Sequence, residues 1–243
     1  MALIYLEIML KYVVMMSYYK GAYILTIQGV LFDLDGTLVN STVLILKTFK
    51  VTLKHFIKRD VPDEEIIRFF GLPLRECLAN FDAAQVDEMI TYYRNYNNEM
   101  HDVLLQPFPH IEDGLKRLEN MQIKKAVVTS KTHNMAKRGL KILKLDKYIL
   151  DIIGCEECTK HKPDPEPMLK GAASIILPPG KCLCVGDSPY DLLSGRAAGC
   201  KTVAVGWSLF DKKYFFSLIK PDYVIEDLQE LGDIVQSINE KGQ

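Results

Sequence analysis

Short, continuously apolar segments recur along this chain, and stretches with helical spacing of apolar residues separate them. Such segments read as strands over 24–32, 123–129, 148–153, 182–185, 202–205 and 223–225. Apolar residues three and four positions apart predict helices over 111–121, over 133–143, after Pro165 and over 190–198. Apolar strands that alternate with helices are typical of a parallel sheet covered on both faces. The pattern therefore predicts an α/β fold.

A different pattern occupies residues 41–108, where no convincing strand is found. Ser41 and Thr42 are suited to capping a helix, and two more helices are predicted over 63–70 and from about residue 83 to 105. Prolines at 107 and 109 end the last of them. We interpret this block as an all-α insertion in the α/β pattern.

The first 23 residues are apolar and rich in Met and Tyr. Glu7 and Lys11 interrupt the apolar run, and neither a basic segment before it nor a cleavage site after it is found. A signal peptide or a spanning helix is therefore poorly supported. We interpret residues 1–23 as an N-terminal extension, with attachment to a membrane surface left open as an alternative.

Composition argues against a nucleic-acid-binding protein, an anionic-membrane-binding protein and a disulfide-rich protein. The chain has 243 residues, 48% of them hydrophobic, and its 30 Lys and Arg balance 31 Asp and Glu. This balance gives no electrostatic footprint for nucleic acid or for an anionic membrane. Six cysteines are too few for a disulfide scaffold of this length, so a cytoplasmic, reducing location is expected.

The segment VLFDLDGTL at residues 30–38 carries the clearest chemistry. Asp33 and Asp35 lie two positions apart at the end of an apolar strand, so their side chains project the same way. Two carboxylates that close repel each other unless a cation or a proton lies between them. Either solution suits phosphoryl transfer, whereas a simple turn with two solvated acids is the alternative.

Three further motifs follow other predicted strands. Thr129 and Ser130 end the strand at 123–129, Lys162 precedes a proline-rich helix entry, and Asp187 and Asp191 flank the start of a helix. Active sites in parallel α/β sheets lie outside the carboxyl ends of the strands. These residues are therefore expected to meet the acidic pair.

Together the four motifs resemble the haloacid dehalogenase superfamily, whose members carry DxDGTL, a strand ending in Thr or Ser, a Lys, and GDxxxD in this order. The resemblance covers about residues 24–226 and implies a Rossmann-like parallel sheet core with an inserted helical cap. On this basis the core comprises 24–40 and 109–243, and the cap 41–108. The strings VVTSK, KPDPEP and VGDSPYD are most similar to phosphoglycolate phosphatases and their related pyrophosphatases.

The resemblance also implies a mechanism. Asp33 would be the nucleophile that forms an aspartyl phosphate, and Asp35 would be the general acid and base. Mg²⁺ would be held by Asp33, the Asp35 carbonyl and Asp187, with Asp191 in support. The expected activity is a Mg²⁺-dependent phosphatase acting on a small phosphorylated metabolite, such as phosphoglycolate or pyrophosphate.

Residues that bind the substrate are expected both in the core and in the cap. By resemblance Thr129 and Lys162 would bind phosphoryl oxygens, with Ser130 beside them. In the cap, the loop at 71–75 is a place where the family often puts specificity residues, and Arg75 could meet a second anionic group.

Two other functions remain as alternatives to the phosphatase. The second hypothesis is a phosphomutase similar to the β-phosphoglucomutases, and the third is a non-catalytic phosphate-binding regulator. Cys155, Cys158 and His161 have the spacing of part of a zinc site, but no second Cys pair lies nearby in the sequence. We interpret them as an ordinary reduced loop, with a bound metal as the alternative.

Overall fold

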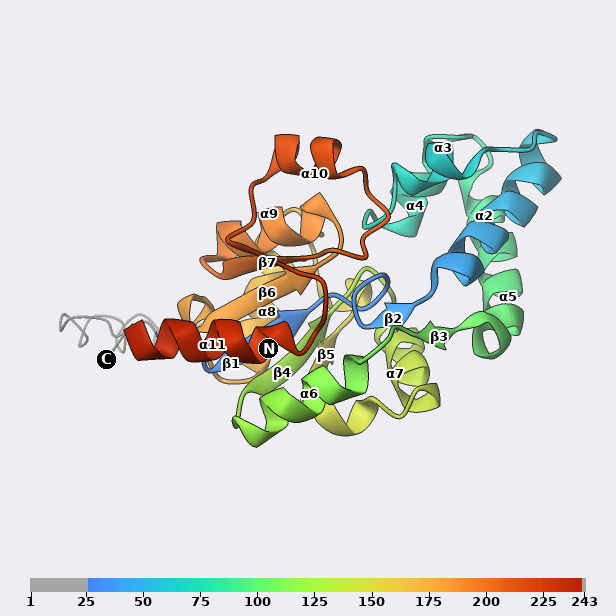
Figure 1. Ribbon diagram of the computed structural model, residues 1–243. Coiled ribbons are helices and arrows are strands. Elements are labelled where there is room, and N and C mark those ends of the chain that lie inside the picture. The colour runs from blue at the N-terminus through green and yellow to red at the C-terminus, as the bar shows by residue number, and fades with distance from the viewer. Residues whose placement is uncertain (1–25, 242–243) are drawn as a thin grey trace, which may run out of the picture.

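A six-stranded parallel sheet forms the centre of the computed structural model, which describes residues 26–241 (Figure 1). In spatial order the strands are β5 (Asp151–Ile153), β4 (Lys124–Val128), β1 (Gly29–Phe32), β6 (Cys182–Gly186), β7 (Lys201–Val205) and β8 (Tyr223–Ile225). Each neighbouring pair runs parallel. The predicted α/β class is confirmed, and β1, which precedes the acidic pair, lies between β4 and β6.

Helices cover both faces of this sheet. One apolar cluster joins it to α6 (Ile111–Asn120), α7 (His133–Ile142) and α11 (Glu230–Lys241). A second cluster on the other face joins it to α8 (Glu166–Ser174), α9 (Pro189–Ala198) and α10 (Lys212–Leu218). Single 3-10 turns at Asp146–Tyr148, Cys155–Glu157 and Pro179–Lys181 complete the connections. Because apolar layers bury both faces, the central strands β1 and β6 are buried along their whole length.

Four helices form a separate layer at one end of the sheet (Figure 1). They are α2 (Thr42–Ile57), α3 (Asp63–Ile67), α4 (Leu74–Ala79) and α5 (Val86–Leu104), and they share an apolar cluster of their own. Two short antiparallel strands, β2 (Val39–Asn40) and β3 (Gln106–Pro107), connect this layer to the core. We call the four helices the cap.

Several local predictions need correction. Ser41 precedes α2, but its side chain makes no capping bond; instead Asn40 Oδ1 accepts from the Thr42 N–H at 3.3 Å. The helix expected over 63–70 ends at Ile67, and the strand expected from 148 begins at Asp151. The helices α4, α10 and α11 were not predicted; α4 begins at Leu74, directly after Pro73, so the loop predicted at 71–75 is shorter and Arg75 lies on a helix.

The predicted extension at 1–23 lies outside the described residues, so its interpretation stays a prediction. Within residues 26–241, no helix combines the length and the hydropathy needed to cross a membrane.

Candidate active site

The four sequence motifs meet at the carboxyl edge of the sheet. Asp33 follows β1, Thr129 follows β4 and Asp187 follows β6, and these three strands are adjacent. Lys162 reaches the same point from the loop between β5 and α8. All four side chains are buried. The predicted constellation is therefore assembled in one place.

Lys162 is the cation at the centre of this site. Its Nζ lies 2.7 Å from Asp33 Oδ1 and 2.6 Å from Asp191 Oδ1, and it also donates to the Val128 carbonyl at 2.7 Å. Burial alone would lower the pKa of Lys162, but the two carboxylates outweigh burial and raise it. The lysine therefore stays charged and fixes one oxygen of Asp33.

Three buried carboxylates crowd together beside this lysine. Oxygens of Asp33, Asp187 and Asp191 lie within 4.8 Å of one another. Burial is the main cause that raises the pKa of Asp187 well above its usual range, and the charges of Asp33 and Asp191 raise it further. One lysine does not balance three acids, and hard oxygen ligands are those that Mg²⁺ prefers. The donor set thus fits a divalent cation.

Hydrogen bonds at the start of α9 fix Asp191, which with Asp187 forms the second acidic motif. Ser188 and Asp191 form a capping box at the start of α9: Asp191 Oδ2 accepts from the Ser188 N–H at 3.0 Å and from its hydroxyl at 2.6 Å. Lys162 holds the other oxygen of Asp191. Asp191 therefore supports the site from a rigid position, while Asp187 Oδ1 faces the Thr37 hydroxyl at 3.4 Å.

Gly36 permits the close approach of the two acidic motifs. Its φ is +82°, and a Cβ at this position would lie 2.3 Å from Asp187 Oδ2. We expect Gly36→Ala to lower the free energy of unfolding by about 1–3 kcal/mol and to reduce activity, because it strains the turn and displaces Asp187. Gly199→Ala is the matched control: its φ is +94°, but no atom lies within 4 Å of the added carbon. Urea unfolding and activity assays compare the two, and an equal cost with no loss of activity in either would contradict this role.

Asp35 forms an ion pair that the sequence did not reveal. Lys131 Nζ lies 2.5 Å from Asp35 Oδ1, and both side chains are largely but not fully buried. The Lys131 N–H also donates to Thr129 Oγ1 at 3.1 Å, which leaves the Thr129 hydroxyl proton for another acceptor. The only sequence signal for Lys131 was its position directly after Thr129 and Ser130.

Ser130 and Arg75, the other two predicted substrate-binding residues, each contact another part of the protein. The Ser130 hydroxyl donates to the Gly71 carbonyl at 2.9 Å, which connects the core to the cap. Arg75 borders the same cavity as the acidic pair, but its guanidinium forms an ion pair with Asp87 and is more than half exposed. Both remain predicted substrate-binding residues, each already with a partner in the protein.

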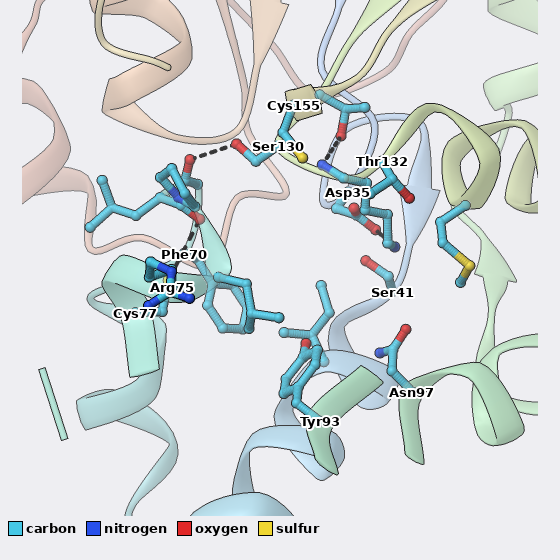
Figure 2. Close-up of a pocket in the computed structure, with 18 of the residues that line it drawn as sticks. Asp35, Ser41, Phe70, Arg75, Cys77, Tyr93, Asn97, Ser130, Thr132 and Cys155 are labelled. Atoms are coloured by element: carbon cyan, nitrogen blue, oxygen red, sulfur yellow. Dashed lines mark hydrogen bonds and ion pairs between the residues drawn. The ribbon is translucent and has the colours of Figure 1, made fainter. Parts of the chain in front are cut away.

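A cavity of about 960 Å³ lies between the core and the cap, over the acidic pair. Core residues such as Asp33 and Thr129 border it below, and α2, α4 and α5 supply the opposite wall. Figure 2 shows Ser41, Tyr93 and Asn97 on the cap side of Asp35. The sequence did not place these residues in the site, because Ser41 was interpreted as a helix cap and the two residues of α5 occupy positions typical of helix packing.

Cys155, Cys158 and His161 also border this cavity, and both thiols are free. Burial, the largest cause, raises the pKa of each thiol. Within residues 26–241, the one grouping suited to a metal ion is the acidic triad, so no zinc cluster forms from these three residues as they are placed.

Comparison with known proteins agrees with this geometry. The sequence profile of the haloacid dehalogenase-like hydrolases matches residues 30–205. A protein of Caldanaerobacter subterraneus subsp. tengcongensis named "Putative pyrophosphatase PpaX" is 42% identical, and the match covers 88% of this chain and 97% of that protein. Pyrophosphatase PpaX of Bacillus mycoides is 37% identical, with 88% of this chain and 99% of the relative covered.

A solved structure of a haloacid dehalogenase-like protein has the same fold. A haloacid dehalogenase-like family hydrolase from Streptococcus pneumoniae superposes with a TM-score of 0.76 at 26% identity, covering 86% of this chain and 98% of that one. This chain belongs to the haloacid dehalogenase-like hydrolase family. Within it, the chain is a hydrolase of the phosphatase type.

Proposed function

We propose that this protein is a Mg²⁺-dependent phosphatase that hydrolyses a small phosphorylated metabolite through an aspartyl-phosphate intermediate. The observation that carries the proposal is the buried lysine that bridges Asp33 and Asp191 beside a third carboxylate. A nucleophilic acid, a fixed cation and a ligand set for a divalent ion then lie within one cluster. An anionic nucleophile that meets an anionic phosphate needs such cations.

Asp33 is the nucleophile in this proposal. Lys162 holds its Oδ1 at 2.7 Å, so Oδ2 attacks phosphorus while the bond from phosphorus to the leaving oxygen breaks. The Thr129 hydroxyl oxygen already accepts from the Lys131 backbone N–H, so the hydroxyl donates a hydrogen bond to a phosphoryl oxygen. Mg²⁺ held by Asp33, the Asp35 carbonyl and Asp187, with Asp191 in support, would supply positive charge against the phosphoryl oxygens.

Asp35 moves the proton. It borders the cavity, and Lys131 fixes one of its oxygens. Asp35 gives a proton to the leaving oxygen in the first step and takes one from the attacking water in the second. The water then attacks phosphorus, and Asp33 is released as a carboxylate.

The expected substrates are small and carry a second negative charge. Pyrophosphate is first, because two relatives that span almost the whole chain are named as pyrophosphatases. Phosphoglycolate is second, on the similarity of the motif strings to phosphoglycolate phosphatases. The cap forms the wall of the cavity opposite the acidic pair, so we place the selection of substrate there. Six free cysteines, four of them buried, suit a reducing cytosol.

The test is phosphate release from a panel of phosphorylated metabolites that includes pyrophosphate and phosphoglycolate. We expect turnover of at least one member with Mg²⁺, loss of activity with excess EDTA, and recovery when Mg²⁺ is restored. Full activity in EDTA would contradict the metal requirement. Binding without release of phosphate from any member would instead favour the regulator, and conversion of glucose 1-phosphate to glucose 6-phosphate faster than phosphate release would favour the mutase.

A further inference from the structure

Three long cationic side chains border the cavity: Arg75, Arg94 and Lys131. Two of them already have a carboxylate partner, because Arg75 pairs with Asp87 and Lys131 with Asp35. In the described part of the chain, Arg94 has no ion pair and no hydrogen bond. Its charge is therefore available to a bound anion without breaking an existing contact.

The helix that carries Arg94 presents a continuous side to the cavity. Ile90, Tyr93, Arg94 and Asn97 all border it, and their spacing of three, four and seven residues places them on one face of α5. Arg94 is exposed, whereas Tyr93 and Asn97 are buried. Arg94 is thus a solvent-accessible member of a helix face whose neighbouring side chains are packed.

Arg94 and Cys155 both border the cavity, Arg94 from α5 of the cap and Cys155 from the core. Its charge acts on the Cys155 thiol, whose pKa it lowers against the larger effect of burial. The Cys155 N–H donates to the Lys131 carbonyl at 2.9 Å, and Lys131 in turn holds Asp35. The cavity lining therefore places Arg94 in the cap wall, and these contacts connect Cys155 in the core wall to Lys131, the partner of the proposed proton donor Asp35.

The Ser41 hydroxyl is a second polar group that borders the cavity and has no hydrogen-bond partner within residues 26–241. Ser41 is 1% exposed, borders the cavity, and its hydroxyl makes no hydrogen bond. An unsatisfied buried hydroxyl is destabilising, and a ligand atom that accepts from it at this position would remove that cost. Figure 2 places Ser41 beside Asp35 and Asn97, and places Arg75 apart from them, next to Cys77 and Phe70.

We propose that Arg94 and Ser41 form the subsite for the leaving group, with Arg94 binding a second phosphate or carboxylate and Ser41 donating to an oxygen near the scissile bond. The inference rests on the proposed phosphatase function and deepens it. Arg94 thereby takes the specificity role that the sequence suggested for Arg75. A guanidinium suits both anions, because its planar fork binds two oxygens at once.

Steady-state kinetics with two substrates tests the subsite. For pyrophosphate, Arg94→Ala is expected to lower kcat/KM by about 10-fold or more, the loss typical of a charged hydrogen bond. For p-nitrophenyl phosphate, kcat/KM should change less than about 2-fold, because its leaving group lacks a second anion for Arg94 to bind. Arg94→Lys should restore part of the loss. Arg59→Ala is the matched control, since Arg59 pairs with Glu65 on the cap and does not border the cavity.

Three kinetic results would overturn the proposal: equal losses on both substrates in Arg94→Ala, no loss on pyrophosphate, or a selective loss in Arg75→Ala alone. Ser41→Ala should lower kcat/KM for pyrophosphate without lowering the melting temperature. A fall in melting temperature with unchanged kinetics would assign Ser41 to the fold instead.

Calorimetric binding separates failure of the subsite from failure of the proposed function. In the Asp33→Asn background with Mg²⁺, adding Arg94→Ala should weaken pyrophosphate binding about 10-fold or more and leave orthophosphate binding unchanged. If wild type releases no phosphate but this binding difference appears, the subsite stands and the phosphatase proposal fails. If wild type is active and the two binding constants do not differ, the phosphatase stands and the subsite fails.

Discussion

Asp33→Asn is expected to lower the turnover number by at least about 10³-fold, because the amide retains the shape of the carboxylate but is a poor nucleophile. The variant should remain folded. Its amide oxygen can still accept from Lys162, and one charge leaves a cluster of three buried acids. The measurement is phosphate release with the best substrate of the panel, together with the melting temperature.

Asp60→Asn provides the control for this substitution. Asp60 is exposed at the end of the cap, where it pairs with Lys54, and it does not border the cavity. Its activity should equal that of wild type. Near wild-type turnover in Asp33→Asn would remove Asp33 from the chemistry and with it the proposed intermediate.

Lys162→Met should impair both activity and stability. Methionine retains much of the length of the side chain, but it leaves Asp33 and Asp191 buried without their cation and the Val128 carbonyl without its donor. Removing one partner of a buried ion pair costs about 3–5 kcal/mol. We expect a fall of that size in the free energy of unfolding in urea without Mg²⁺, and loss of activity by at least about 10²-fold with it.

Lys160→Met is the matched control, two residues away. Lys160 is 71% exposed and lies 3.4 Å from Asp164, so its pair should contribute at most about 1 kcal/mol. If Lys162→Met were as stable and as active as Lys160→Met, the buried lysine would not be the organising cation of the site.

The sequence predicted the sheet and the position of its site because both depend on local patterns. Continuous apolar runs identified the strands that the structure contains at 124–128, 182–186 and 201–205. The acidic pair and Lys162 were recognised from their motifs, and the parallel sheet then required them to meet at one edge.

Contacts between distant segments could not be predicted in the same way. The pairing of Lys131 with Asp35 depends on the neighbouring positions of β4 and β1, and the pairing of Arg75 with Asp87 depends on the packing of α4 against α5. Ser41 illustrates the same limit. Its sequence context predicted a helix cap, whereas the structure uses Asn40 for that bond and leaves the Ser41 hydroxyl in the cavity.

The most direct test of the central claim is to identify the phosphorylated residue. Wild-type enzyme with Mg²⁺ and its best substrate is quenched in acid during turnover, and peptide mass spectrometry then locates any added phosphoryl group. The account predicts one phosphoryl group on Asp33, and none in the Asp33→Asn variant. A phosphoryl group on any other residue would contradict it.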